Sequence, residues 1–185
     1  MKSARLLGKE PTSLPVAADD ITELHAARLL LLIHHCGSKD QIDGLTKLAK
    51  LDFFVRYPAF FYRAAKRPDD AASQQSEGGS SVESSMVRHH YGPWDKRYYQ
   101  VLAFLESRGV LSVVKQGNAF EFTLTDMGRA KANALSQEES FKPLASHMKA
   151  VRKAFGRKTG TQLKNLVYEV FDAEVKQRKL GDVIQ

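Results

Sequence analysis

Histidine and cysteine are the side chains of this sequence best suited to bind a metal or to act as nucleophiles. His25, His34, His35 and the single Cys36 all fall in one predicted helix. Neighbours one or two positions apart on a helix do not face each other, and no other cysteine or carboxylate has matching metal-site spacing. We therefore predict no metal site, no cofactor and no Cys–His nucleophile, and interpret these histidines as surface or core residues.

Catalytic motifs are missing from the sequence. It contains no G-x-S-x-G, H-E-x-x-H or C-x-x-C motif and no glycine-rich phosphate loop. The basic turn at residues 157–161 could hold a phosphate through exposed N–H groups and cations. It lacks the full P-loop pattern, so we do not predict a nucleotide site there. The sequence indicates a protein that is not an enzyme.

The positive charge of the chain is concentrated in one segment. The 185 residues include 28 Lys and Arg against 21 Asp and Glu, for a net charge of +7. Seven cations and no acid lie between Phe141 and Tyr168: Lys142, Lys149, Arg152, Lys153, Arg157, Lys158 and Lys164. Such asymmetry predicts an anionic partner, either double-stranded DNA or an acidic protein surface. The alternative is a solvated helix face that only keeps the protein soluble.

A second candidate surface combines basic and aromatic residues at positions 89–99. Nucleic-acid surfaces place cations on phosphates and rings on bases or sugars, and Trp, Tyr and Arg also dominate protein-interface hot spots. The candidates for DNA or partner binding are Lys96 and Arg97, and the candidate partner-binding aromatics are Tyr91, Trp94 and Tyr99. A third interpretation puts the rings of Trp94 and Tyr98 in the core.

Residues 91–134 show the pattern around which the chain is organised. A helix is predicted after Gly92-Pro93, with an apolar face at i, i+3, i+4 and i+7 and an end at Gly109. Two strands follow at residues 110–114 and 120–124, joined by a turn at 116–118. Thr125 or Asp126 is expected to cap a further helix to about residue 135. This order resembles the back half of a winged-helix domain.

The N-terminal half is predicted to supply the other helices of that domain. Residues 20–36 form the first, with Asp20 and Glu23 as a capping box and Gly37 as its end. Its LLLLI run is apolar nearly all round, which predicts the central helix. Residues 38–43 are read as a connection, and a second helix spans residues 42–57. The cations expected off its apolar face are Lys47, Lys50 and Arg56.

The remaining segments complete the predicted organisation. A short helix is expected at residues 59–66, a polar mobile loop at 67–85 and a strand at 86–91 that pairs with the wing. Residues 141–155 and about 161–171 have helical apolar faces, separated by a break at Gly156, and a polar tail follows.

Together these patterns predict a mostly α fold with a small β-wing, as a winged helix-turn-helix core with extra C-terminal helices. The expected parts are a flexible arm at 1–18, a winged-helix domain at 19–136 with a disordered insert at 67–85, and a basic helical extension at 137–185. We predict a cytoplasmic protein, because the sequence has a single cysteine and no signal peptide. We predict no membrane segment, because the sequence has no apolar run of about 20 residues.

Three runs resemble those of a type of small bacterial protein. They are LTKLAKLDFFVRYPAFFYRAAK, VRHHYGPWDKRYYQVLAFLESRGVL and FGRKTGTQLKNLVYEVF. The chain resembles the small middle subunit of Lamassu and ABC-three-component anti-phage defence systems, over roughly residues 45–171. The resemblance implies an accessory subunit without an active site, which accompanies an SMC-like ATPase and an effector nuclease and helps to sense or hold DNA.

The alternative function is a stand-alone winged-helix transcription regulator that binds operator DNA as a dimer. In that case residues 94–108 would be its recognition helix in the major groove. Three cations and two acids give this segment a net charge of only +1. Because the excess charge lies elsewhere, the sequence favours the subunit over the regulator.

Overall fold

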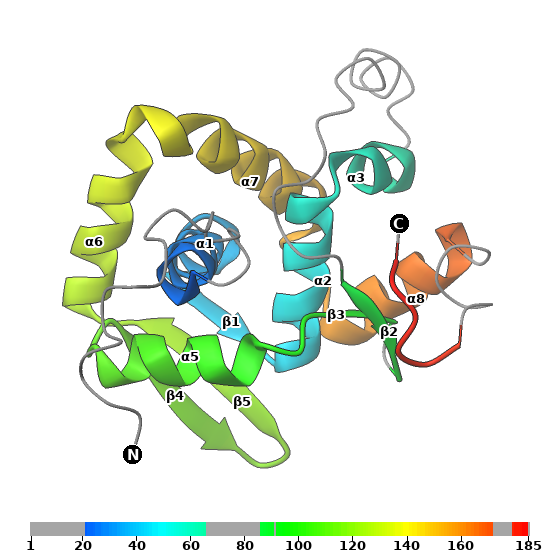
Figure 1. The fold of residues 1–185 in the computed structure, drawn as a ribbon, viewed down its shortest axis with the longest axis horizontal. Coiled ribbons are helices and arrows are strands. Elements are labelled where there is room, and N and C mark those ends of the chain that lie inside the picture. The colour runs from blue at the N-terminus through cyan, green and yellow to red at the C-terminus, as the bar shows by residue number, and fades with distance from the viewer. Residues whose placement is uncertain (1–20, 66–85, 91, 172–178, 185) are drawn as a thin grey trace, which may run out of the picture.

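The computed structural model describes residues 21–65, 86–90, 92–171 and 179–184 (Figure 1). The predicted arm at 1–18 and insert at 67–85 lie outside the described residues. The described chain is mostly helical, as the sequence predicted, and it contains two small antiparallel sheets. Its helices are α1 (Thr22–Cys36), α2 (Leu45–Arg56), α3 (Pro58–Ala64), α5 (Tyr98–Ser107), α6 (Asp126–Gln137), α7 (Lys142–Phe155) and α8 (Gly160–Val170).

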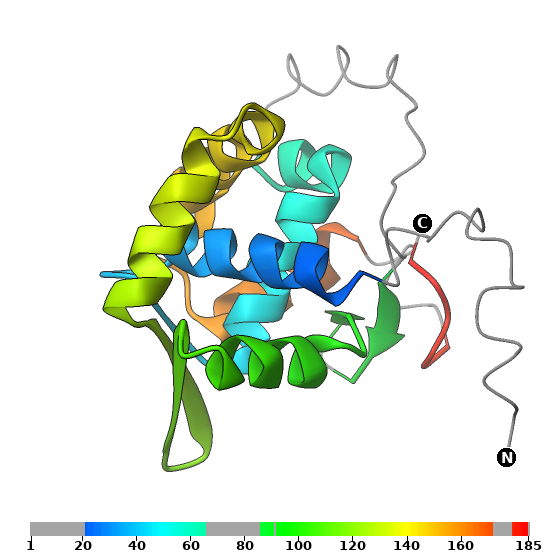
Figure 2. The same ribbon diagram turned by 60° about the vertical axis from the view of Figure 1, so that its left-hand side comes forward.

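Helix α1 is the centre of the fold. Its run from Leu29 to Ile33 is at most 3% exposed, because α2, α5, α6 and α7 surround it (Figures 1 and 2). The prediction of a central helix ended by Gly37 is confirmed. The predicted capping box is not: the N-cap residue is Ile21, no described side chain caps the helix, and Asp20 lies outside the described residues.

A three-stranded antiparallel sheet lies beside this helical ring, with strand order β1-β5-β4. The hairpin of β4 (Leu111–Gln116) and β5 (Ala119–Leu124) is the predicted wing, and it projects from the body of the molecule (Figure 2). Residues 38–43, expected to be a connection, contain strand β1 (Gln41–Asp43), which pairs Ile42 with Phe122. Three residues are too few to show strand alternation, so β1 depends on its partner strand.

The predicted pairing of residues 86–91 with the wing is wrong. Strand β2 (Val87–His89) instead pairs with β3 (Gly92–Trp94) in a separate sheet. The helix predicted to begin after Gly92-Pro93 begins at Tyr98. Gly92 has a φ of 91°, which lies outside the helical region and turns the chain into a strand.

Part of the C-terminal segment, expected to be a polar tail, pairs with β2, where Val183 forms an isolated β-bridge with Val87. The amide of Arg88 donates to the carbonyl of Asp182, and the amide of Ile184 donates to the carbonyl of Met86, both at 2.8 Å. The Ile184 side chain is fully buried. One apolar residue among polar neighbours gives no periodic signal, although its burial joins the C-terminus to the core.

The C-terminal helices are part of the same core as the rest of the chain. Helix α7 packs on α1 and α2, and α8 packs on α2. The predicted apolar faces are buried, including Met148, Val151, Phe155, Leu163 and Val167. Gly156 ends α7, as predicted. The two helices of the basic C-terminal segment, α7 and α8, therefore pack directly on the core helices α1 and α2.

Candidate nucleic-acid and partner interface

The exposed face of α5 carries no positive charge. The sequence of the helix, YYQVLAFLES, contains no Lys or Arg. Its apolar side is buried as predicted, and its outer side presents Tyr99, Gln100, Ala103 and Glu106. The segment 94–108 was expected to be one helix with a net charge of +1, but its three cations all lie beyond the ends of α5. The helix itself has a net charge of −1.

The candidate basic residues before α5 differ in environment. Lys96 is exposed in the turn before the helix. Arg97 is turned inward: its Nε lies 3.3 Å from Oδ1 of Asp95, and its Nη1 lies 2.9 Å from Nε2 of His25. The side chain of Arg97 is 27% exposed. Lys96 therefore remains available at the surface, whereas Arg97 mainly joins elements within the protein.

Of the three candidate aromatics, Trp94 and Tyr99 lie in described parts of the chain and differ in exposure. Trp94 is only 9% exposed, stacks on His89 at 5.2 Å between ring centroids and meets the ring of Tyr98 edge-on at 5.3 Å. Trp94 thus belongs to the core, as the third interpretation of this segment held. Tyr99 is 64% exposed and fits a partner surface. Tyr91 lies outside the described residues.

Tyr99 borders a small apolar hollow between α5 and the wing. The hollow has a volume of about 140 Å³ and is lined by residues of both elements, including Leu102, Phe120 and Phe122. Phe120, which lies on the same face of β5 as Phe122, is 39% exposed. Exposed aromatic rings beside a shallow apolar hollow are typical of protein-binding surfaces.

The predicted cationic segment forms the exposed side of α7 and the turn before α8. Lys149, Arg152, Lys153 and Arg157 are exposed, whereas Lys158 and Lys164 are half-buried. Lys142 is paired with Glu139. In both views α7 lies on the opposite side of α1 from α5 (Figures 1 and 2). The cations of α7 and the cation-free outer face of α5 therefore form two separate surfaces.

The cationic surface extends to the C-terminal end of α1. The guanidinium of Arg152 lies 3.5 Å from the carbonyl oxygen of His35, and the ring of His35 bonds to Ser136 at 2.9 Å. Burial, followed by the charges of His34, Lys149 and Arg152, lowers the pKa of His35 to about 4. His35 is therefore neutral near pH 7, and the charge of this surface comes from Lys and Arg.

The basic turn at residues 157–161 is already capped from within the protein. The Thr159 hydroxyl accepts from the amide of Gln162 at 3.2 Å, and the Gln162 side chain accepts from the amide of Thr159 at 2.8 Å. This capping box occupies two of the N–H groups that a phosphate would need. What remains for an anion is mainly the exposed charge of Arg157.

A buried ionic cluster that the sequence analysis missed lies beneath α5. Asp52 accepts from Arg28 Nε at 2.9 Å and from the Tyr98 hydroxyl at 2.8 Å, and Asp95 accepts from Arg56 Nη1 at 2.9 Å. Arg56, predicted off the apolar face of α2, has a side chain only 3% exposed. The one local signal was an acid inside the apolar run around Asp52. The cluster joins α1, α2 and the start of α5.

Lys50 is a second correction to the prediction for α2. It was expected off the apolar face, but it is fully buried, and its Nζ donates to the carbonyl oxygen of Pro93 at 2.8 Å. Burial lowers the pKa of Lys50 to about 7. Lys47, in contrast, is half-buried and donates to the carbonyl oxygen of Gly156 at 3.0 Å. Lys47 and Lys50 therefore link α2 by hydrogen bonds to the residue that ends α7 and to strand β3.

The histidines and the cysteine have structural partners. His34 Nδ1 lies 2.7 Å from Oδ1 of Asp40, and the buried thiol of Cys36 donates to the carbonyl oxygen of Met148 at 3.3 Å. Burial raises the pKa of Cys36 to about 12. Within the described residues, no three His, Cys, Asp or Glu side chains gather so that they could hold a metal ion.

Comparisons with known proteins give no relative from which a function could be inferred. No protein-family model, curated protein or solved structure matches the chain. Among the described helices, none has the length and apolar character needed to cross a membrane. The function must therefore be argued from the two surfaces and from the order of the elements.

Proposed function

We propose that this chain is a non-catalytic winged-helix accessory subunit of a bacterial anti-phage defence complex. It docks on a partner protein through α5 and the wing, and it presents the cations of α7 and the following turn to double-stranded DNA. The resemblance of its sequence to the middle subunits of Lamassu and ABC-three-component systems suggests an SMC-like ATPase and an effector nuclease as the partners.

The order of the elements supports a winged-helix core. Helix α1, strand β1, helices α2 and α5 and the hairpin β4–β5 follow one another, and β1 pairs with β5 to close a three-stranded sheet. Helix α3 and the sheet of β2 and β3 are inserted between α2 and α5. In this arrangement α5 has the position of a recognition helix and β4–β5 that of the wing.

The absence of cations from the exposed face of α5 is the observation on which the proposal depends. A recognition helix that reads DNA needs cations and amide groups near phosphates and base edges. The outer side of α5 presents Tyr99 and Glu106, and its neighbour on the wing is the exposed ring of Phe120. Exposed aromatic residues on a surface without cations fit a protein–protein interface, where aromatic side chains are enriched. The position of a recognition helix is therefore used here to bind protein.

A stand-alone transcription regulator is the competing function, and the two make different demands on α5. A regulator must place α5 in the major groove, where Glu106 would face the phosphates and add repulsion. A subunit needs only an anionic partner for α7, on the other side of α1. The location of the exposed cations favours the subunit.

Copurification of the tagged chain with the products of its neighbouring genes tests the proposal. After DNase treatment, we expect an ATPase and a nuclease to remain bound in stoichiometric amounts. The double variant Tyr99→Ser/Phe120→Ser should lose these partners while the chain stays folded, because Tyr99 is 64% and Phe120 39% exposed and neither belongs to the core. Leu180→Ser, which removes a 52% exposed side chain elsewhere, is the matched control and should retain them.

Two other results would contradict the proposal. A chain that purifies alone as a dimer and releases short DNA would identify a transcription regulator. Retention of the partners by the Tyr99→Ser/Phe120→Ser variant would show that the face of α5 and the wing is not the docking surface.

A further inference from the structure

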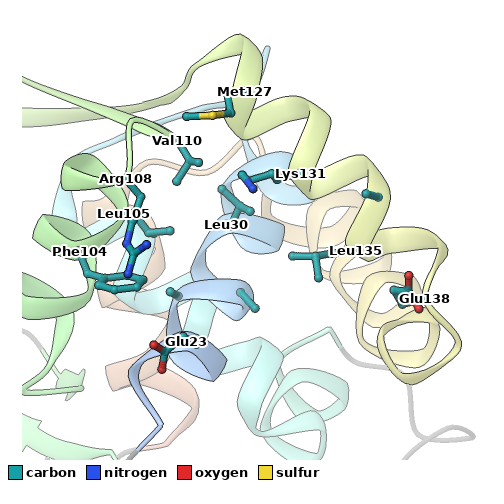
Figure 3. A pocket seen from close by; sticks show the side chains of 13 residues that line it. Glu23, Leu30, Phe104, Leu105, Arg108, Val110, Met127, Lys131, Leu135 and Glu138 are labelled. Atoms are coloured by element: carbon teal, nitrogen blue, oxygen red, sulfur yellow. The ribbon is translucent and has the colours of Figure 1, made fainter.

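A larger apolar groove lies on the other side of α5, between α1, α5 and α6 (Figure 3). Its volume is about 830 Å³. Ala26 and Leu30 of α1 form the floor, Leu105 and Val110 one wall, and Met127 and Leu135 the other. Met127 is 46% exposed. This groove shares no lining residue with the hollow between α5 and the wing, so the two surfaces can be tested separately.

The polar side chains of the groove are restricted to its rim and are all charged. Glu23 and Glu138 lie toward the end of the groove away from Met127, and Lys131 lies nearer Met127; the side chain of Arg108 extends between them toward Phe104 (Figure 3). All four residues are exposed, and none forms an ion pair with another described residue. The guanidinium of Arg108 lies over the ring of Phe104, 5.0 Å from its centroid. The rim therefore carries charges of both signs, with its two acids toward the end away from Met127.

We propose that this groove binds an amphipathic helix of a partner protein, with its apolar face inserted and charged flanks of both signs. Cations of that helix would lie beside Glu23 and Glu138, and its carboxylates beside Arg108 and Lys131. This inference goes beyond the proposed function, because it does not depend on which complex contains the chain or on the face of α5 and the wing.

A helix fits this groove better than an extended peptide. The interior of the groove offers apolar side chains and no polar side chain to pair with a peptide backbone. An extended segment would bury unpaired N–H and C=O groups there, whereas a helix satisfies its own. Helices also bind grooves between other helices by inserting apolar residues spaced at i, i+3, i+4 and i+7. The apolar interior of the groove thus favours a helical partner segment, and the charged rim favours a segment with charges of both signs.

Three synthetic helical peptides serve as probes for the full-length chain. All three carry the same leucine face, and they differ only in four flanking positions. The mixed peptide has two Lys at one end and two Glu at the other, whereas the control peptides have four Lys or four Glu. A mixed peptide can bind in either direction, so its polarity along the groove need not be known. We expect it to bind at least tenfold more tightly than both controls at low salt.

Two pairs of variants locate the binding site. Ala134→Trp places a large ring in the groove and should abolish binding, while Ala130→Trp on the same helix, exposed and outside the groove, should not. Glu23→Lys/Glu138→Lys makes the whole rim basic and should transfer the preference to the four-Glu peptide. That change of preference requires a folded protein, which keeps the test informative even if affinity falls.

Three results would overturn the proposal. Equal binding of all three peptides would show that the rim does not select charge. Unchanged binding by Ala134→Trp would place the peptide elsewhere. A folded chain that binds none of the peptides would mean that the groove is not open to a partner helix, as when residues 1–20 of the chain or a second copy already occupies it. Because Tyr99 and Phe120 do not line the groove, these outcomes are independent of the copurification experiment.

Discussion

The hydroxyl of Tyr98 donates a 2.8 Å hydrogen bond to Oδ2 of Asp52, and both side chains are at most 1% exposed. The bond joins the first turn of α5 to the middle of α2, 46 residues earlier in the chain. Burial and the charge of Asp52 raise the pKa of Tyr98 well above its usual value, so its hydroxyl stays protonated and can donate. The position of α5 on the core thus depends on a polar contact as well as on apolar packing.

The first prediction concerns this contact. Tyr98→Phe keeps the ring but leaves one oxygen of Asp52 without its donor, which should cost about 1–3 kcal/mol in the free energy of unfolding. Urea denaturation measures the loss. Tyr99→Phe is the matched control, since the neighbouring hydroxyl belongs to a side chain that is 64% exposed, and it should change stability very little. Equal effects of the two variants would show that the buried hydrogen bond contributes nothing.

The second prediction concerns Asp95, whose side chain is 7% exposed. Burial alone would raise the pKa of Asp95, but the amide of Arg97 and the charges of Arg56 and Arg97 outweigh it and leave the pKa below its usual value of 3.8. This stabilisation is complete above pH 3.8 and is lost as the pH falls through the lowered pKa. Asp95→Asn removes the carboxylate that accepts from Arg56 Nη1 at 2.9 Å and should cost about 3–5 kcal/mol near neutral pH.

Acid denaturation provides the measurement for Asp95. The stability difference between the native chain and Asp95→Asn should narrow as the pH is lowered below 3.8, because a protonated Asp95 resembles asparagine. Asp43→Asn, which changes an exposed carboxylate, should follow the native curve. A difference between the native chain and Asp95→Asn that does not depend on pH would mean that the carboxylate acts by packing alone.

The third prediction concerns the buried amine of Lys50. Its pKa falls from 10.5 to about 7 on folding, so the unfolded chain binds more protons than the folded chain between these values. Stability should therefore rise with pH across that window. Lys50→Met replaces the side chain by an uncharged one that is one atom shorter, and it should stabilise the protein by about 1–4 kcal/mol at pH 7 and below.

Thermal unfolding at several pH values between 7 and 10.5 distinguishes the cost of burying the Lys50 amine from the gain of its hydrogen bond to Pro93. The Lys50→Met variant should show a flatter dependence on pH than the native chain, whereas Lys153→Met on the exposed side of α7 should not. If Lys50→Met proves less stable at every pH, the hydrogen bond to the carbonyl of Pro93 outweighs the cost of burying the amine.

The fourth prediction separates the two surfaces by charge. Lys149→Glu/Lys153→Glu should weaken binding to double-stranded DNA and reduce the slope of log affinity against log salt by about 2, because each phosphate contact contributes about 0.9 to that slope. Lys96→Glu/Lys115→Glu makes the same change of charge beside α5 and on the wing, and it should leave the slope nearly unchanged. Fluorescence anisotropy over a range of salt concentrations gives both values. A larger loss in the second variant would place DNA across α5 and the wing, as in a transcription regulator.

Local patterns in the sequence were enough to predict most of the helices and the wing. The apolar positions of α5, including Val101 and Leu105, are buried as their spacing predicted, and the hairpin turns at Gly117, whose φ of 59° favours glycine. Thr125 caps α6 by accepting from the amide of Gly128. Each of these features depends on neighbours within a few positions, so a short window of sequence contains the necessary information.

What the sequence determined by itself was the type and order of these elements and the amount of positive charge in the C-terminal segment. Only the tertiary structure decided that Lys50, Asp52 and Arg56 are buried and that the cations of α7 lie across α1 from α5. A charged residue can be buried only where partners offset its loss of hydration. Those partners lie far away in sequence; Arg28 and Asp52, for example, are 24 positions apart. A pattern within a short window of sequence therefore does not predict them.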